Sequence, residues 1–205
     1  MSSLTFDLVM RIIFLLSWII FGGIRIYYGH ESPWAKQSRS ERFESIREDG
    51  LAGGIFLLVL FYSFFFVTFL YLIDFPLISW SYFPLLPEIR VLGVILGILS
   101  FPYIYWAHKT LGKAFSATIQ TQEASMLVTK GPYARIRHPI YSSHTLFNFG
   151  MVLVSANLLI LAYLLVGMPF TYKRMFKEEE NLIQNFGEEY EEYMKRTGRI
   201  FPKIL

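Results

Sequence analysis

Cysteine is absent from this chain of 205 residues. Disulfide bonds, thiolate zinc sites and cysteine nucleophiles are therefore excluded from any account of its function. Charged residues are also scarce, at 17% against the roughly 25% of ordinary soluble domains. Hydrophobic residues make up 54% of the chain and fall into long runs, which is typical of an integral membrane protein.

Four apolar regions are long enough for a helix to cross a bilayer, which takes about 20 residues. Three of them are Phe6–Tyr28, Leu51–Ile73 and Ile89–Trp106. The fourth, Leu146–Phe170, fits either one long span or a tight hairpin of two short helices. A hairpin would turn at Ser155-Ala156-Asn157, where polar side chains can satisfy freed backbone groups.

The placement of lysine and arginine decides between these two arrangements. These residues gather in the loops 29–50 and 108–142 and in the C-terminal part 173–203, whereas the loop 74–88 has none. A hairpin places all three basic regions on one side of the membrane, as the positive-inside rule requires. The sequence therefore predicts an all-α integral membrane fold with five transmembrane helices, the last two a short hairpin, and the N-terminus outside.

The chain has room for one membrane domain and for no separate soluble domain. Residues 1–107 are expected to form three transmembrane helices, and residues 108–205 a second half with the hairpin, a cytoplasmic loop and a C-terminal helix. From Lys177 to Arg196, apolar residues recur at helical spacing beside glutamates. We expect this helix to emerge from the last span and fold back on the loop. The small size fits a prokaryotic inner membrane, and the positive-inside rule predicts that the site faces the cytoplasm.

Two polar clusters interrupt the apolar chain. Gly131–Tyr141 contains two arginines, a histidine and two tyrosines, and Lys173–Glu180 follows it after the hairpin. Charge this close to a bilayer is costly and is usually kept for a ligand or a headgroup. Arg174 and Glu178 are four residues apart and therefore share one helix face. We predict that the two clusters face each other at the membrane surface.

The order of these residues resembles the isoprenylcysteine carboxyl methyltransferase family, with the phospholipid N-methyltransferases as more distant kin. The similarity extends from Leu111 to Pro202, nearly half of the chain. One departure is Ser143, where many relatives have glycine. The segments that carry the resemblance are Leu127–Tyr133, Arg137–Tyr141, Glu178-Glu179 and Phe186–Tyr190.

The resemblance implies an integral membrane methyltransferase that uses S-adenosylmethionine, with Arg174 as the catalytic residue that contacts the substrate. The chemistry of this cofactor adds Arg137 as a donor for its carboxylate, and Glu179 is included beside Glu178, although such glutamates are more often solvated. The cofactor contacts carried over by position are Gln120, Ser125, Met126, Leu127, Val128, Tyr133, His138, Pro139, Ile140, Tyr141 and Glu178.

Two further residues are candidates for binding the substrate. His108 ends the third span on the inner side, where it is placed to line an entrance. Asn148 lies within an apolar helix and is either a pocket residue or an interhelical hydrogen-bonding group. The histidines lack the spacing of metal ligands, so no metal site is expected.

The site residues also have ordinary structural interpretations. These are lipid-phosphate anchoring for Arg137, helix capping for His138, an interfacial aromatic belt for Tyr133 and Tyr141, and a helix-surface ion pair for Arg174 and Glu178.

The leading hypothesis is an S-adenosylmethionine-dependent methyltransferase that acts on a lipidic or amphipathic acceptor, with isoprenylcysteine-type carboxyl O-methylation as the first choice. The nearest alternative is N-methylation of a phospholipid or other amine, or S-methylation of a thiol. NADPH-dependent membrane sterol-type reductases share the Arg-His-Pro-x-Tyr pattern, and a non-catalytic scaffold is the third class. Expected partners are a lipidic or prenylated small-molecule substrate and membrane lipids, without nucleic acid. The sequence leaves the oligomeric state open.

Overall fold

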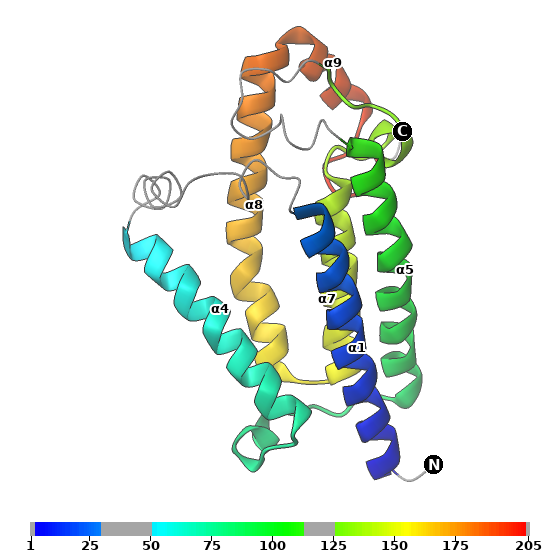
Figure 1. Cartoon of the computed structure of the whole chain (residues 1–205), viewed down its shortest axis with the longest axis vertical. Helices are drawn as coiled ribbons and strands as arrows, with labels where there is room; N and C mark the ends of the chain where they lie inside the picture. Colours follow the sequence, from blue (N-terminus) through cyan, green and yellow to red (C-terminus); the bar gives the residue numbers. More distant parts are fainter. Residues whose placement is uncertain (1–2, 30–50, 113–125, 204–205) are drawn as a thin grey trace.

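The regular elements of the computed structural model are all helices within the residues that it describes, which are 3–29, 51–112 and 126–203 (Figure 1). Three helices are long and apolar enough to cross a membrane: Leu4–Tyr28, Pro87–Leu111 and Leu158–Phe186. The all-α membrane fold is thereby confirmed, whereas the number of five spans stays a prediction. The elements are α1 (Ser3–Gly29), α4 (Leu51–Leu72), η1 (Pro76–Ser81), α5 (Pro87–Leu111), η2 (Gly131–Ala134), α7 (Pro139–Ser155), α8 (Leu158–Phe186) and α9 (Glu188–Arg196).

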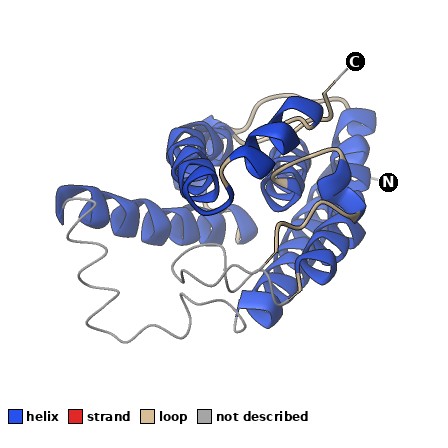
Figure 2. Cartoon of the chain, turned by 90° about the horizontal axis from the view of Figure 1, so that it is seen from above, coloured by secondary structure: helices blue, strands red, loops and turns tan. Residues whose placement is uncertain are grey.

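Helices α1, α5 and α7 pack side by side, while α8 stands next to them and α4 extends away (Figures 1 and 2). The core between α1 and α7 is aromatic, with the rings of Phe21 and Phe147 stacked 4.0 Å apart. Short α9 lies across one end of this bundle, which we call the α9 end. The C-terminus of α1, the C-terminus of α5 and the start of α7 also lie at the α9 end (Figure 1).

Small residues bring α5 and α7 close together, as is common between membrane helices. A Cβ atom added to Gly93 of α5 would lie 2.6 Å from the carbonyl oxygen of Gly150 of α7. The close approach depends on these two glycines, because neither backbone has room to move without disturbing the other helix.

We expect the Gly93→Ala variant to lose about 1–3 kcal/mol of stability, because the added methyl group overpacks this helix contact. Thermal unfolding of the protein in detergent measures the loss. Gly22→Ala in α1 is the matched control, since a Cβ atom there meets nothing within 4 Å. Equal melting temperatures for the two variants would contradict the close packing of α5 on α7.

The fourth apolar region is interrupted at the turn that the sequence predicts. Helix α7 ends at Ser155, and Ala156 adopts a left-handed conformation with φ of 48°. The side chain of Asn157 then caps α8 by accepting hydrogen bonds from the backbone N–H groups of Leu159 and Ile160, at 3.0 and 3.3 Å. The hairpin turn at Ser155-Ala156-Asn157 is therefore confirmed.

Two arginines anchor the opposite end of the bundle. Arg90 at the start of α5 forms an ion pair of 2.5 Å with Asp7 of α1 and donates a hydrogen bond to the carbonyl of Val154. Arg11 of α1 pairs with Asp74 at 2.6 Å. These cations stabilise helix packing far from the predicted site.

The predicted single helix Lys177–Arg196 is wrong in one respect, because Gly187 breaks it into the end of α8 and the separate α9. Gly187 has φ of 52°, a conformation that side chains with a Cβ atom rarely adopt. The break lets α9 turn back, and the hydroxyl of Tyr193 donates a 2.6 Å hydrogen bond to the carbonyl of Tyr133. The expected folding of this region onto the loop is therefore confirmed.

Candidate functional site

The C-terminal tail pairs with the polar loop and fixes its backbone. The N–H groups of Arg137 and His138 donate to the carbonyls of Gly198 and Arg199, at 2.8 and 3.0 Å, and the N–H of Gly198 donates to Arg135. This pairing holds the loop in an extended form just before α7 begins. The side chains of Arg137 and His138 are thereby presented to α8.

Glu179 of α8 lies at the centre of a buried cationic cluster. Its carboxylate accepts hydrogen bonds from Arg137 Nε at 2.9 Å and Arg199 Nη2 at 2.7 Å, and lies 3.2 Å from His138 Nε2. Only 3% of Glu179 is exposed. The ordinary interpretation of Glu179 as a solvated side chain is therefore wrong, because it faces the loop rather than water, whereas Glu180 is exposed. The predicted contact of Glu179 with a cofactor stays a prediction.

Glu179 lies in the polar C-terminal part of α8, beyond the apolar region that ends at Phe170. Burial on its own would raise the pKa of the Glu179 carboxyl. The hydrogen bonds from His138, Arg199 and Arg137 outweigh this effect and lower the pKa to about 2. Glu179 is thus ionised at neutral pH and serves as the counterion for the cluster.

The side chain of Arg137 contacts protein groups on several segments. Besides Glu179, its Nη1 donates to the carbonyls of Thr197 at 2.5 Å and Met194 at 3.2 Å. With its side chain only 8% exposed, Arg137 is not an anchor for lipid phosphate. It links the loop to α8, α9 and the tail, and its contact with a cofactor stays a prediction.

A second carboxylate, Glu178, joins the two polar clusters. It accepts a 2.8 Å hydrogen bond from the hydroxyl of Tyr141 at the start of α7, and Arg174 Nε lies 3.4 Å from the same oxygen. His138 Nδ1 is 3.9 Å from its other oxygen. The prediction that the two clusters face each other is confirmed by these contacts, and Arg174, 62% exposed, remains accessible.

Two further structural alternatives do not hold at this site. His138 occupies the N-cap position of α7, but its side chain makes no capping hydrogen bond and instead contacts Glu179. Tyr133 is buried beneath α9 rather than placed in an interfacial belt, and this burial raises the pKa of its hydroxyl. The ion pair of Arg174 and Glu178 is present, but Tyr141 makes it part of a larger contact.

The other predicted cofactor contacts come from the same two segments. Met126 is exposed, and Leu127 and Val128 are half-buried in irregular chain that leads to η2. Pro139 is buried and Ile140 half-buried in the first turn of α7. Gln120 and Ser125 lie outside the described residues.

The two candidates for binding the substrate differ in exposure. His108 is 2% exposed, and its ring is covered by Tyr28 of α1, stacked 4.9 Å away. Another neighbour is Arg25 of α1, which no sequence motif singles out and whose Nη1 lies 3.0 Å from Nε2 of His108. Asn148 is half-buried on α7, and both of its possible roles stay predictions.

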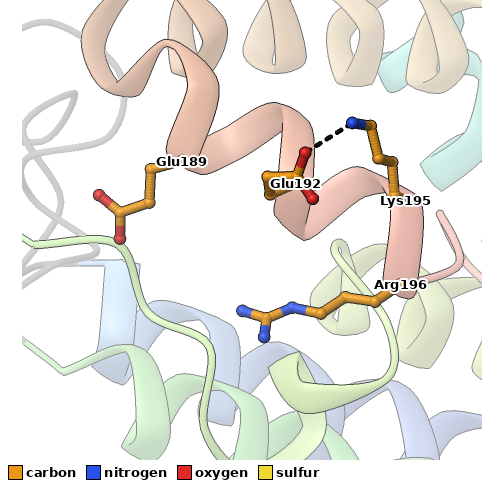
Figure 3. A pocket seen from close by; sticks show the side chains of 4 residues that line it. All are labelled: Glu189, Glu192, Lys195 and Arg196. Atoms are coloured by element: carbon orange, nitrogen blue, oxygen red, sulfur yellow. Dashed lines mark hydrogen bonds and ion pairs between the residues drawn. The ribbon is translucent and has the colours of Figure 1, made fainter.

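A pocket of about 590 Å³ lies over α9 (Figure 3). Its lining consists of Glu189, Glu192, Lys195 and Arg196, all of which are exposed. Glu192 and Lys195 neutralise each other in an ion pair of 2.5 Å. This surface hollow includes none of the predicted site residues. Within the part of the chain that the structure describes, no three side chains of His, Asp or Glu are grouped to hold a metal ion.

The fold and the site define an integral membrane protein with a polar, carboxylate-centred site at one end of a helical bundle. Residues 92–184 match the sequence model of the "Isoprenylcysteine carboxyl methyltransferase (ICMT) family". A probable protein-S-isoprenylcysteine O-methyltransferase of Oryza sativa subsp. japonica is 33% identical over 128 residues, covering 60% of this chain and 67% of the relative. The chain belongs to the isoprenylcysteine carboxyl methyltransferase family.

Two further relatives include one with a different name. Protein-S-isoprenylcysteine O-methyltransferase of Tribolium castaneum is 34% identical over 129 residues, which are 60% of this chain and 46% of the relative. Cobalt-zinc-cadmium resistance protein CzcN of Cupriavidus metallidurans is 29% identical over 122 residues, or 59% and 51% of the two chains. The chain thus spans about half the length of these curated relatives.

A solved structure agrees with the fold over most of the chain. It is that of the eukaryotic intramembrane Ras methyltransferase ICMT without a monobody, with a TM-score of 0.53 and 25% sequence identity. The similarity covers 92% of this chain and 68% of that one. It therefore extends beyond the segment 92–184 to the N-terminal helices.

Proposed function

We propose that this protein is an S-adenosylmethionine-dependent methyltransferase that methylates the carboxylate of an isoprenylcysteine-type acceptor. Family membership supports the reaction class. The observation that carries the placement of the site is the hydrogen bond of Tyr141 to Glu178, which joins the loop cluster to the α8 cluster. The acceptor is lipidic, and the site faces the cytoplasm of a prokaryotic cell whose inner membrane the chain crosses five times.

The residues present suit this cofactor, which carries ribose hydroxyls and an ammonium group as donors. Glu178 receives Tyr141 and Arg174 on one oxygen, whereas its second oxygen lies 3.9 Å from the ring nitrogen Nδ1 of His138. Lone pairs of that second oxygen are therefore available to a hydroxyl or ammonium donor. Half-buried Leu127, Val128 and Ile140 add apolar surface of the kind that an adenine ring requires.

The bound cofactor would supply an electrophilic methyl group. Glu178 would hold the cofactor, and the hydroxyl of Tyr141 fixes the position of this carboxylate. Exposed Arg174 would attract the acceptor's carboxylate, which is already ionised and nucleophilic at neutral pH. Such an acceptor needs no general base, so the chain mainly binds, orients and excludes water.

Incubating detergent-purified protein with methyl-labelled S-adenosylmethionine and N-acetyl-S-farnesyl-cysteine tests this function. We expect the label to enter the acceptor and to be released as methanol by mild base, because the product is a carboxyl ester. Label that resists base and appears in phospholipid or in a thiol would favour N- or S-methylation instead. Absence of calorimetric binding at roughly 1 mM S-adenosylmethionine, which corresponds to about −4 kcal/mol or weaker, would contradict the proposal.

A further inference from the structure

Arg25 lies at the α9 end of α1 and contacts the imidazole of His108. Its Nη1 atom is 3.0 Å from Nε2 of His108 on α5. Because a guanidinium only donates hydrogen bonds, this nitrogen accepts, and the imidazole is neutral with its proton on Nδ1. Tyr28 stacks on the same imidazole ring with an interplanar angle of 3°. Arg25 is therefore positioned by His108, but its charge is not neutralised by it.

Arg25 and Arg174 together place two positive charges near the one negative charge of Glu178. Glu178, Tyr141 and Arg174 all lie close enough to act electrostatically on its guanidinium, and His144 of α7 is a further neighbour. Nδ1 of His144 lies 2.8 Å from the carbonyl of Ile140, so it donates there. Two arginines thus share the single carboxylate of Glu178, and among the described residues no carboxylate is within ion-pair distance of Arg25.

A half-buried guanidinium at the end of a membrane helix is costly unless it has an anionic partner. Its planar donors suit a carboxylate or a phosphate, each of which can accept two hydrogen bonds at once. Arg25 lies in α1, outside the segment 92–184 that matches the family. The packing of α1 against α5 and α7 brings Arg25 within electrostatic range of Tyr141 and Glu178.

We propose that Arg25 is a further substrate-positioning residue, which together with Arg174 forms a two-arginine site for the carboxylate of a membrane-borne acceptor. This inference rests on the proposed function and names the groups that would hold its acceptor. The side chain of Arg174 is exposed and on its own would fix the acceptor poorly. Arg25, restrained by His108 on a different helix, supplies the second point that orients the carboxylate.

Kinetics of Arg25→Gln and Arg25→Lys with N-acetyl-S-farnesyl-cysteine test this inference in detergent with phosphatidylcholine. We expect Arg25→Gln to raise KM about tenfold with a smaller change in kcat, because one charge-assisted hydrogen bond to the acceptor is lost. Arg25→Lys should recover part of the loss, since it keeps the charge without the planar donors. The calorimetric Kd for S-adenosylmethionine should stay unchanged in both variants. Arg11→Gln at the other end of α1 is the matched control and should leave KM unchanged.

A binding comparison separates this inference from the proposed function. The acid and the carboxamide of N-acetyl-S-farnesyl-cysteine compete for the protein, and we expect the wild type, but not Arg25→Gln, to prefer the acid. If the wild type transfers no methyl group, the proposed function fails, while the preference for the acid still decides the role of Arg25.

Three results would overturn the role of Arg25. The first is an unchanged KM together with an unchanged preference for the acid in folded Arg25→Gln. The second is an effect seen only with phosphatidylglycerol, because the ligand would then be a lipid phosphate. If Arg25→Gln does not fold, the third result is an unchanged KM together with an unchanged preference for the acid in Arg25→Lys.

Discussion

Replacing Glu178 by alanine should weaken the binding of S-adenosylmethionine on the order of 10- to 100-fold, which corresponds to the loss of one hydrogen bond to a charged group. The reason is the position of Glu178, with one oxygen fixed by Tyr141 at 2.8 Å and the other left for a ligand. The fold should tolerate this change, because the partners lost are a single hydroxyl and an exposed arginine. Calorimetric titration of the purified variant measures the loss.

The matched control for this prediction is Arg174→Ala, one helical turn away on the same face. Arg174 is expected to contact the acceptor, so its loss should lower kcat/KM while the affinity for the cofactor is largely kept. If Arg174→Ala instead abolishes cofactor binding, this division of roles is wrong. If Glu178→Ala binds the cofactor as tightly as the wild type, the site itself is misplaced.

The architecture of the hairpin could be predicted because two independent signals agree on it. Basic residues on both sides of Leu146–Phe170 require an even number of crossings between them. The polar turn at Ser155-Ala156-Asn157 offers a place for the chain to reverse, and Asn157 caps α8 there. A second contact of Asn157, a 2.7 Å hydrogen bond from its Nδ2 to Ser81 Oγ, joins segments far apart in sequence and has no local signal.

The roles of two adjacent glutamates could not be distinguished from the sequence. Neighbouring residues on a helix point about 100° apart, so Glu178 and Glu179 necessarily face different surroundings. Which of them faces the loop depends on how α8 is rotated, and this is set by the packing of buried Met175 and of the tail. The spacing of Arg174 and Glu178 was informative because four residues return the chain to the same face.

Arg25 and Gly187 show two further limits of sequence reasoning. The significance of Arg25 depends on its contact with His108 of α5 and on its electrostatic interaction with groups of α8, which no local pattern encodes. Gly187, by contrast, has a local signal, since a glycine within a helical pattern is a candidate end of a helix. The amphipathic period continues through the break, which explains why one helix was expected where the structure has two.

Removing the buried carboxylate of Glu179 should have the largest effect on stability. Glu179→Ala leaves Arg137 buried without its counterion, and breaking such a pair costs about 3–5 kcal/mol. Both Arg137 and Arg199 contact Glu179, so its loss also frees the tail from the loop that carries His138. We expect a drop of roughly 10 °C in the melting temperature in detergent, whereas the exposed neighbour in the variant Glu180→Ala should change it little.

The dependence of stability on pH gives a second measurement of the same cluster. The pKa of Glu179 falls from 4.5 to about 2 in the fold, so its ionised form stabilises the protein fully above pH 4.5. This contribution, on the order of 3 kcal/mol, is lost progressively as the pH falls from 4.5 towards 2. The Glu179→Gln variant should therefore show a flatter decline of melting temperature over this range than the wild type. Parallel declines for the two proteins would mean that the cluster around Glu179 does not hold the tail, and the positioning of His138 would then need another cause.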